Sequence, residues 1–196
     1  MSPSPINAAL ESDQIRSARN GDEYAFLALY HRHRRAIFQF AWRMTRSQAA
    51  AEDIVQECFL ALMQGAAFNT ARGELRTYLY GIARNLVFRR LKIAERETEE
   101  TIDAPAAHAC FKNIDTLDDL ISAERADLIA NAVARLPILQ REAIVLFTYE
   151  ELSLEEIARI ANIDVGAVKS RLHRARESLR TMLTPLLIPE SRRNSL

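Results

Sequence analysis

Apolar residues recur at intervals of three and four along most of the chain, which is the spacing of one face of an α-helix. No run alternates apolar and polar residues between turns as a half-buried strand would, and glycine is scarce, with 5 residues in 196. The pattern therefore predicts an all-α protein. The helices are expected at 13–20, from 22 to about 46, and at 47–64, 74–92, 120–136, 141–149, 153–161 and 164–184.

Two of these predicted helices are separated by a very short turn. Ser153 and Glu156 have the spacing of a capping box, in which each side chain accepts from a backbone amide at a helix start. Asn162 tolerates the left-handed conformation that leaves a helix tightly. Asp164 can cap the helix that follows. Two helices joined in this way predict a helix-turn-helix.

The second helix of this pair has two different faces. Its apolar stripe consists of Val165, Val168, Leu172, Ala175 and Leu179. The opposite face carries Gly166, Ala167, Ser170, His173 and Arg174, flanked by Lys169, Arg171, Arg176 and Arg180. Small and polar residues near the N-terminal end can approach base edges, while surrounding cations can bind phosphates. This arrangement favours DNA binding over the alternative of an ordinary solvated basic face.

At these residues the sequence resembles a known family. GAVKSRLHRARESLR is similar to the recognition helix in region 4 of bacterial RNA polymerase sigma factors of the extracytoplasmic-function (ECF) class, and 136–158 is similar to the rest of that region. The resemblance implies contacts to the −35 promoter element from Gly166, Ala167, Lys169, Ser170, Arg171, His173, Arg174 and Arg176. It also implies that this region contacts the flap of the polymerase.

The helix predicted at 47–64 has a core face and a mixed face. The core face consists of Val55, Cys58, Phe59, Leu62 and Met63. Leu60 lies among polar residues, where it is either an ordinary surface leucine or part of an interface. AEDIVQECFLALMQ resembles sigma region 2.2, which docks on the clamp of the polymerase's largest subunit. The resemblance implies polymerase contacts at Asp53, Gln56, Glu57 and Leu60.

The helix predicted at 74–92 places Leu75, Leu79, Ile82 and Leu86 on its core side. Tyr80, Arg84 and Phe88 follow one another at intervals of four on the far side. Aromatic rings between cations form a platform on which unpaired bases can stack, although both rings can equally pack against a neighbouring helix. FNTARGELRTYLYGIARNLVFRRL is similar to sigma regions 2.3 and 2.4. That likeness implies −10 element contact and melting by Phe68, Asn69, Arg72, Thr77, Tyr80, Arg84, Asn85 and Phe88.

Charge is segregated along the chain, although the formal net charge is +0. One basic block lies at 32–46, a second at 84–92 and a third on the recognition helix, whereas 95–119 carries eight acidic residues against Arg96 and Lys112. Such segregation suits a protein that meets DNA at chosen places. We expect a tail at 1–10, a sigma region 2 domain at 11–94, a flexible acidic linker at 95–119, a sigma region 4 domain at 120–184 and a C-terminal tail at 185–196.

The remaining chemistry is sparse. Cys58 is expected to be a small buried thiol, and His108 with Cys110 is a weak metal signal. We expect no cofactor and no metal. The N-terminus lacks a signal-peptide pattern and no segment is long enough to span a bilayer, so we expect no membrane insertion and a cytoplasmic location.

These features bear on three classes of function. A promoter-specificity subunit explains both DNA-facing patterns, and the resemblance implies core RNA polymerase, double- and single-stranded promoter DNA and an anti-sigma factor as its partners. A stand-alone helix-turn-helix regulator of duplex operator DNA leaves the face at 80–88 and the patch at 53–60 without a purpose. No acid/base pair, activated nucleophile or metal cluster points to an enzyme.

Overall fold

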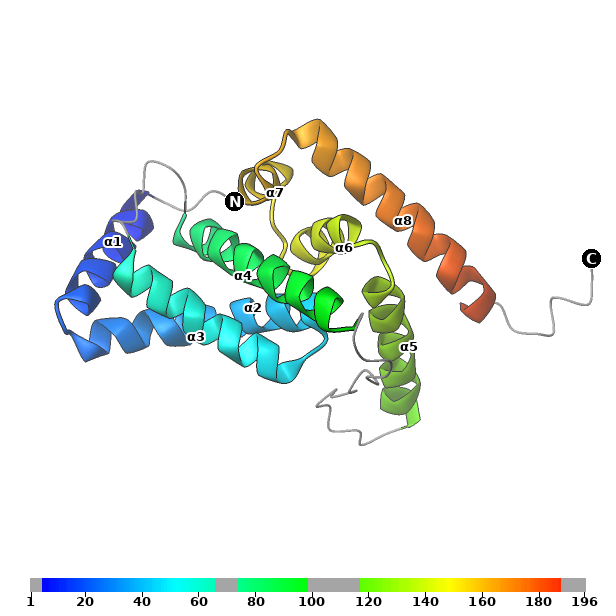
Figure 1. Ribbon diagram of the computed structural model, residues 1–196, viewed down its shortest axis with the longest axis horizontal. Coiled ribbons are helices and arrows are strands. Elements are labelled where there is room, and N and C mark those ends of the chain that lie inside the picture. The colour runs from blue at the N-terminus through cyan, green and yellow to red at the C-terminus, as the bar shows by residue number, and fades with distance from the viewer. Residues whose placement is uncertain (1–4, 66–73, 99–116, 188–196) are drawn as a thin grey trace, which may run out of the picture. The chain divides into compact units, whose positions relative to one another are not determined.

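The computed structural model describes residues 5–65, 74–98 and 117–187. In these ranges the secondary structure is helical throughout, with eight α-helices and one π-helical segment. The described helices fall into two compact units, and each is described by itself (Figure 1). The predicted all-α fold with two helical domains is confirmed.

The first unit, drawn in blue to green in Figure 1, is built around one long helix. Its elements are α1 (Pro5–Arg19), α2 (Glu23–Thr45), α3 (Gln48–Gln64) and α4 (Leu75–Thr98). Helix α2 packs against each of the other three, and α3 also packs against α4. The fully buried large side chains include Leu29, Ile37, Phe40, Met44, Ile54, Leu62, Leu75 and Leu79. Arg19 donates to the carbonyl of Leu62 over 2.6 Å, which ties the end of α1 to α3.

Local chemistry sets where these helices begin. The Asp22 carboxylate accepts from the Ala25 amide over 3.1 Å, and the Ser47 hydroxyl accepts from the Ala50 amide over 3.2 Å. Each bond satisfies one of the amides that a helix start leaves unpaired. Arg46 adopts a φ of 58° between α2 and α3, which turns the chain sharply. Both caps are as predicted.

The second unit contains the helix pair that was predicted to bind DNA. Its elements are α5 (Leu117–Ala134), α6 (Ile138–Ile144), the π-helical η2 (Val145–Tyr149), the first part of α7 (Leu154–Ala161), as far as Ala158, and α8 (Val165–Leu187). Helix α6 packs along α8, and α5 packs against both. The buried residues of α6, η2 and α8 include Ala143, Ile144, Val145, Leu146, Val168, Leu172 and Ala175.

Several helix boundaries differ from the sequence expectation. Helix α5 begins at Leu117, inside the predicted linker, and α6 begins at Ile138, before the predicted start at 141. Helix α1 begins at Pro5, inside the predicted tail, and α4 continues to Thr98, beyond the predicted end at Lys92. Helix α8 runs to Leu187 and contains Pro185, which was expected to stop it. Pro185 has no amide to donate to the carbonyl of Thr181, but both residues are exposed near the end of the helix, so water can bond to that carbonyl instead.

Among the described helices, none combines the length and the apolar character that crossing a bilayer requires.

Candidate nucleic-acid and partner interfaces

The helix pair α7 and α8 is joined as the sequence predicts. The Ser153 amide donates to the Glu156 carboxylate over 2.8 Å, and the Glu156 amide donates to the Ser153 hydroxyl over 3.2 Å, which completes the capping box. Asn162 has a φ of 53° and leaves α7 in the left-handed conformation. The Ala167 amide donates to Asp164 over 2.8 Å and caps α8. This backbone geometry is a helix-turn-helix.

Five polar or charged side chains among the predicted DNA contacts of α8 are exposed: Lys169, Ser170, His173, Arg174 and Arg176. Gly166 is exposed as well, and Ala167 is half-buried. A Cβ at position 166 would lie 2.9 Å from the Asp164 carboxylate that caps the helix. Glycine therefore leaves room for the cap and keeps this end of the helix slim. A slim, polar N-terminal end is what a helix needs to approach base edges.

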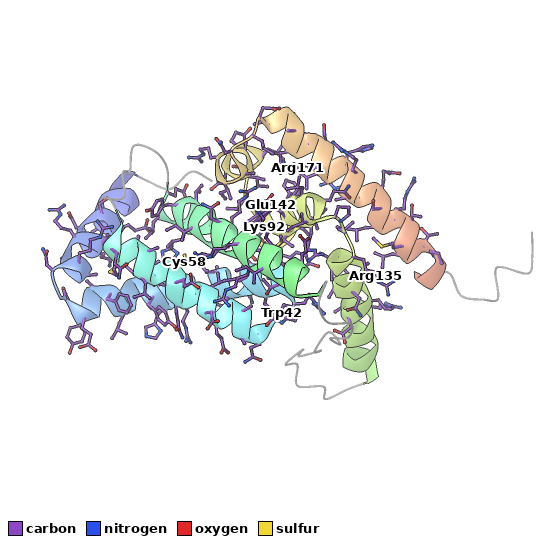
Figure 2. The ribbon with its side chains drawn as sticks, viewed as in Figure 1. Trp42, Cys58, Lys92, Arg135, Glu142 and Arg171 are labelled. Atoms are coloured by element: carbon purple, nitrogen blue, oxygen red, sulfur yellow. The ribbon has the colours of Figure 1, made fainter. Side chains whose placement is uncertain are left out.

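The flanking cations of α8 differ in what they contact. The Arg171 guanidinium lies 3.3 Å from the carboxylate of buried Glu142 on α6 (Figure 2). Arg176 lies over the Phe147 ring, with its guanidinium carbon 5.4 Å from the ring centroid, and Arg180 pairs with Glu177 at 2.8 Å. From the sequence, these residues were expected to form one group of cations flanking the DNA-binding face. The structure separates Arg171, which faces the protein interior, from the exposed cations.

The acidic patch of α3 is paired with arginines of α4. Asp53, Gln56 and Leu60 are exposed and Glu57 is half-buried, so the four predicted polymerase contacts lie on one accessible face. The Arg90 guanidinium lies 3.0 Å from Asp53 and 3.1 Å from Glu57, and Arg89 also pairs with Glu57. These pairs, more than 30 residues apart in sequence, could not be read from α3 alone.

The pKa of Glu57 reflects this pairing. Partial burial raises the pKa of the carboxyl, but hydrogen bonds and charges from Arg90 and Arg89 together outweigh burial and leave the pKa below its ordinary value. The pKa of Arg90 is raised, mainly by its hydrogen bond to Glu57. Both groups therefore stay ionised at neutral pH, and the patch carries balanced rather than purely negative charge.

The predicted stacking face of α4 is only partly present. Tyr80 is fully buried, with its ring edge-on to Phe40 at a centroid distance of 5.6 Å, and Thr77 is 8% exposed. The prediction of Tyr80 and Thr77 as surface DNA contacts is therefore wrong for this structure. Because α4 packs against both α2 and α3, its buried face is wider than predicted and rotated towards Tyr80.

The rest of that face remains accessible. Asn85 is exposed, and Phe88 and Arg84 are half-buried, with the Arg84 guanidinium carbon 4.5 Å from the centroid of the Phe88 ring. One ring carrying a cation is still a surface on which a base can stack. Three further predicted −10 contacts lie outside the described residues: Phe68, Asn69 and Arg72.

Sequence reasoning missed His33, which lies in the run of basic residues at 31–35. His33 is buried, and its Nε2 atom lies 3.8 Å from the Glu11 carboxylate of α1. Burial, together with the positive charges of Arg32 and Arg76, lowers the pKa of His33 to about 4. Burial likewise raises the pKa of Glu11, although Arg32 opposes this. The burial of His33 could have been inferred from its position, because it lies four residues after Leu29 and four before Ile37, both on the buried face of α2.

Sequence reasoning also missed a groove between α2 and α3. It has a volume of about 410 Å³ and is lined by Tyr30, Arg34, Arg35, Phe38, Glu52, Val55 and Gln56. Arg34 lies over the Tyr30 ring, with its guanidinium carbon 5.7 Å from the centroid. Gln56 belongs both to this groove and to the acidic patch of α3, so the two features are continuous.

The thiol of Cys58 is buried as predicted (Figure 2), and burial raises its pKa to about 12. A thiol with such a pKa stays protonated and unreactive at neutral pH. Within the described ranges, no three His, Cys, Asp or Glu side chains are grouped as metal ligands. His108 and Cys110 lie outside the described residues.

Comparison with known proteins points in one direction. Residues 29–97 match the family described as Sigma-70 region 2, and residues 126–179 match Sigma-70, region 4. The chain is 34% identical over 183 residues to the ECF RNA polymerase sigma factor SigW of Bacillus subtilis (strain 168). The aligned region covers 88% of this chain and 96% of SigW. It is 33% identical over 189 residues to the RNA polymerase sigma-H factor of Pseudomonas aeruginosa, covering 90% and 96% of the two chains.

Solved structures are similar as well. RpoE from Bartonella quintana, crystallised with the anti-sigma factor NepR, matches with a TM-score of 0.61 and 28% identity, over 81% of this chain and 94% of that chain. CnrH, solved in complex with the cytosolic domain of CnrY, matches with a TM-score of 0.63 and 25% identity, over 89% and 97%.

Proposed function

Because this chain belongs to the extracytoplasmic-function class of bacterial RNA polymerase sigma factors, we propose that it binds core RNA polymerase, directs it to promoters and helps to melt the −10 region. The observation that carries this proposal is the exposed polar face of α8 on a capped helix-turn-helix that matches region 4. Family membership decides against a stand-alone operator-binding regulator. The class consists of non-enzymatic initiation factors, which confirms that the chain is not an enzyme.

We propose that α8 reads the −35 element in the major groove. Ser170 and His173 are exposed near the N-terminal end of α8 and are proposed to contact base edges, and Lys169 and Arg174 can donate to guanine or to phosphate. Gly166 and Ala167 keep the N-terminal end of the helix close to the duplex. Phosphate contacts give affinity and register, while contacts to base edges give sequence preference.

For the −10 element, the described contacts we propose are Arg84, Asn85 and Phe88. The Phe88 ring supports a stacked base, Arg84 holds the backbone of the melted strand, and Asn85 contacts a base edge. The resemblance adds the loop residues Phe68, Asn69 and Arg72. Stacking contributes about 1–3 kcal/mol per base, which offsets an unpairing cost of a few kcal/mol. Trapping unpaired bases therefore favours the open duplex.

We propose that the acidic patch of α3, together with Leu60 at its C-terminal end, binds the clamp of the polymerase's largest subunit, and that the second unit contacts the flap. The carboxylates of Asp53 and Glu57 are between a third and a half exposed and pair with Arg89 and Arg90. Exposed pairs of this kind are worth about 0–1 kcal/mol each. A basic partner surface can therefore displace them at little cost, while Leu60 supplies buried apolar area.

An anti-sigma factor is a further proposed partner. The proposal is supported by RpoE, which was solved with NepR, and by CnrH, which was solved with the cytosolic domain of CnrY. A cytoplasmic location follows from the proposed partners, because core polymerase and promoter DNA are found there in bacteria.

The test is run-off transcription with bacterial core RNA polymerase on a promoter library, followed by sequencing of the DNA upstream of each transcript. We expect enrichment of one −35 and one −10 sequence at a fixed spacing. Arg174→Ala should weaken selection of the −35 sequence, while Arg180→Ala, on the last part of the same helix, should not. Failure of the chain to bind core polymerase, together with regulation through duplex DNA alone, would refute the proposal.

A further inference from the structure

We propose that Arg171 is a positioning residue, which sets the orientation of α8 through its ion pair with Glu142 and does not itself touch DNA. This inference rests on the proposed binding of α8 to the −35 element. It concerns how the helix is held and which of its cations contact phosphate.

The carboxylate of Glu142 lies inside the second unit. Glu142 is 1% exposed on α6, in the apolar run that continues with Ala143 and Ile144. An ionised carboxylate taken out of water needs a charged or hydrogen-bonding partner close by. The Arg171 guanidinium, 3.3 Å away, meets that need from α8, and its side chain is 19% exposed. Figure 2 labels the two residues on their helices.

The pair belongs to a connection that spans three helices. Next to Glu142, Arg141 donates to the carbonyl of Ala134 and, over 3.2 Å, to the carbonyl of Leu136, at the end of α5. Neighbouring residues of α6 thus hold the end of α5 on one side and the middle of α8 on the other. These are directional contacts between helices that also share an apolar core.

Directional contacts are needed because the apolar stripe of α8 is permissive. Val168, Leu172 and Ala175 bury the inner face of the helix, but hydrophobic contact is non-directional and tolerates small rotations. An ion pair with a fixed acid restricts rotation of α8 about its axis. A rotation of this kind would carry Ser170 and Arg174 away from the groove, so the pair controls groups that it does not touch.

The competing interpretation is that Arg171 is a phosphate contact that Glu142 holds back. The two interpretations predict opposite signs for Glu142→Gln. If Glu142 restrains a DNA contact, neutralising it releases Arg171, removes a negative charge near DNA and tightens binding. If the pair positions α8, the same substitution weakens binding.

The experiment uses holoenzyme reconstituted from the full chain and core polymerase. The probe is a fluorescein-labelled duplex that carries the promoter most enriched in the library selection, and binding is measured from 50 to 200 mM salt. For Glu142→Gln and for Arg171→Met we expect binding about tenfold weaker with an unchanged salt slope. The loss in the double variant should be smaller than the sum of the two single losses, because both changes remove the same ion pair. Arg174→Met, the matched control on the same helix, should lower the slope by about 0.9.

Several outcomes overturn the proposal. Glu142→Gln binding as tightly as wild type, or more tightly, excludes positioning, as does a salt slope that falls by about 0.9 in Arg171→Met. Circular dichroism and thermal melting establish that each variant is folded at the assay temperature. If Glu142→Gln does not fold, the paired Glu142→Met/Arg171→Met variant replaces the ion pair with apolar groups, and its slope and affinity decide in the same way. Wild-type holoenzyme that fails to bind the probe refutes the proposed function and this inference with it.

Discussion

Replacing Tyr80 with alanine is expected to destabilise the first unit rather than to act on promoter DNA directly. The ring is fully buried, meets Phe40 edge-on and has the Arg76 guanidinium carbon 5.6 Å from its centroid. Truncating a buried aromatic residue to alanine costs about 3–5 kcal/mol. The edge-to-face contact adds about 0.5–1.5 kcal/mol beyond burial, which places this site in the upper part of that range.

The chain offers a probe for this unit alone. Trp42 is the single tryptophan of the sequence and lies on α2, so its fluorescence during urea unfolding reports on the first unit. With a slope of about 2 kcal/mol per molar urea, a loss of about 4 kcal/mol lowers the unfolding midpoint by about 2 M. A unit of this size is stable by about 5–15 kcal/mol, so the variant stays folded or becomes marginal without denaturant.

Two substitutions serve as controls. Tyr80→Phe keeps the ring and should shift the free energy of unfolding by no more than about 1.5 kcal/mol. Phe88→Ala removes a half-buried ring and should change it by about 1 kcal/mol or less, while slowing promoter opening as measured by permanganate reactivity of unpaired thymines. A Tyr80→Ala variant with a wild-type urea midpoint and slow promoter opening would show that this ring works at the surface, and would refute the reasoning.

Three further outcomes are expected. Replacing both Asp53 and Glu57 with lysine should abolish association with core polymerase in a pull-down while the circular dichroism spectrum stays unchanged. The control Glu52→Lys, on the same helix, should bind normally. Co-purification of the double variant at wild-type levels would contradict the polymerase interface. The free energy of unfolding should fall by up to about 3 kcal/mol as the pH drops from about 6.5 to about 4. The folded protein has a His33 pKa of about 4, so the unfolded chain binds this proton at a higher pH than the folded protein does. A His33→Gln variant with the same loss over that range would rule this out. Asn162→Ala should lower the stability of the helix-turn-helix by about 1–2 kcal/mol and Asn162→Gly should not, because the φ of Asn162 is 53°. Equal melting temperatures for the two variants would argue against backbone strain there.

The helix starts that carry a side-chain cap could be predicted because their causes are local. A cap is made by a side chain and an amide two or three residues further on, so Asp22, Ser47, Ser153 and Asp164 are legible in the sequence and are observed as predicted. The turn at Asn162 is legible for the same reason. The helix-turn-helix, and with it the orientation of the candidate DNA face, therefore followed from short-range chemistry.

The inner face of α4 could not be predicted in the same way. The spacing of Leu75 and Leu79 gives the direction of one packing partner, but α4 packs against two helices, and the second one turns the buried face towards Tyr80 and Thr77. Both residues have a polar group, and on a single helix they resemble surface positions. Burial there is decided by α2, whose Phe40 offers the ring contact.

The ion pairs between distant residues also could not be predicted from the sequence. Arg171 and Glu142 are 29 residues apart, and Arg90 and Glu57 are 33 residues apart. A count of cations on α8 treats five charges as equal. In the folded unit, Arg171 pairs with the buried carboxylate of Glu142 and is half-buried, whereas the other four cations are exposed.

That distinction changes the expected electrostatics of promoter binding. Each phosphate contact contributes about 0.9 to the slope of log affinity against log salt, so five contacting cations on α8 would contribute about 4.5. Arg171 lies on buried Glu142, whereas Lys169, Arg174 and Arg176 are exposed beside Ser170 and His173, and Arg180 lies further along the helix, paired with Glu177. Three contacts contribute about 2.7. The helix is therefore expected to rely less on general attraction to phosphate than its composition indicates, and more on the fixed placement of its polar face against base edges.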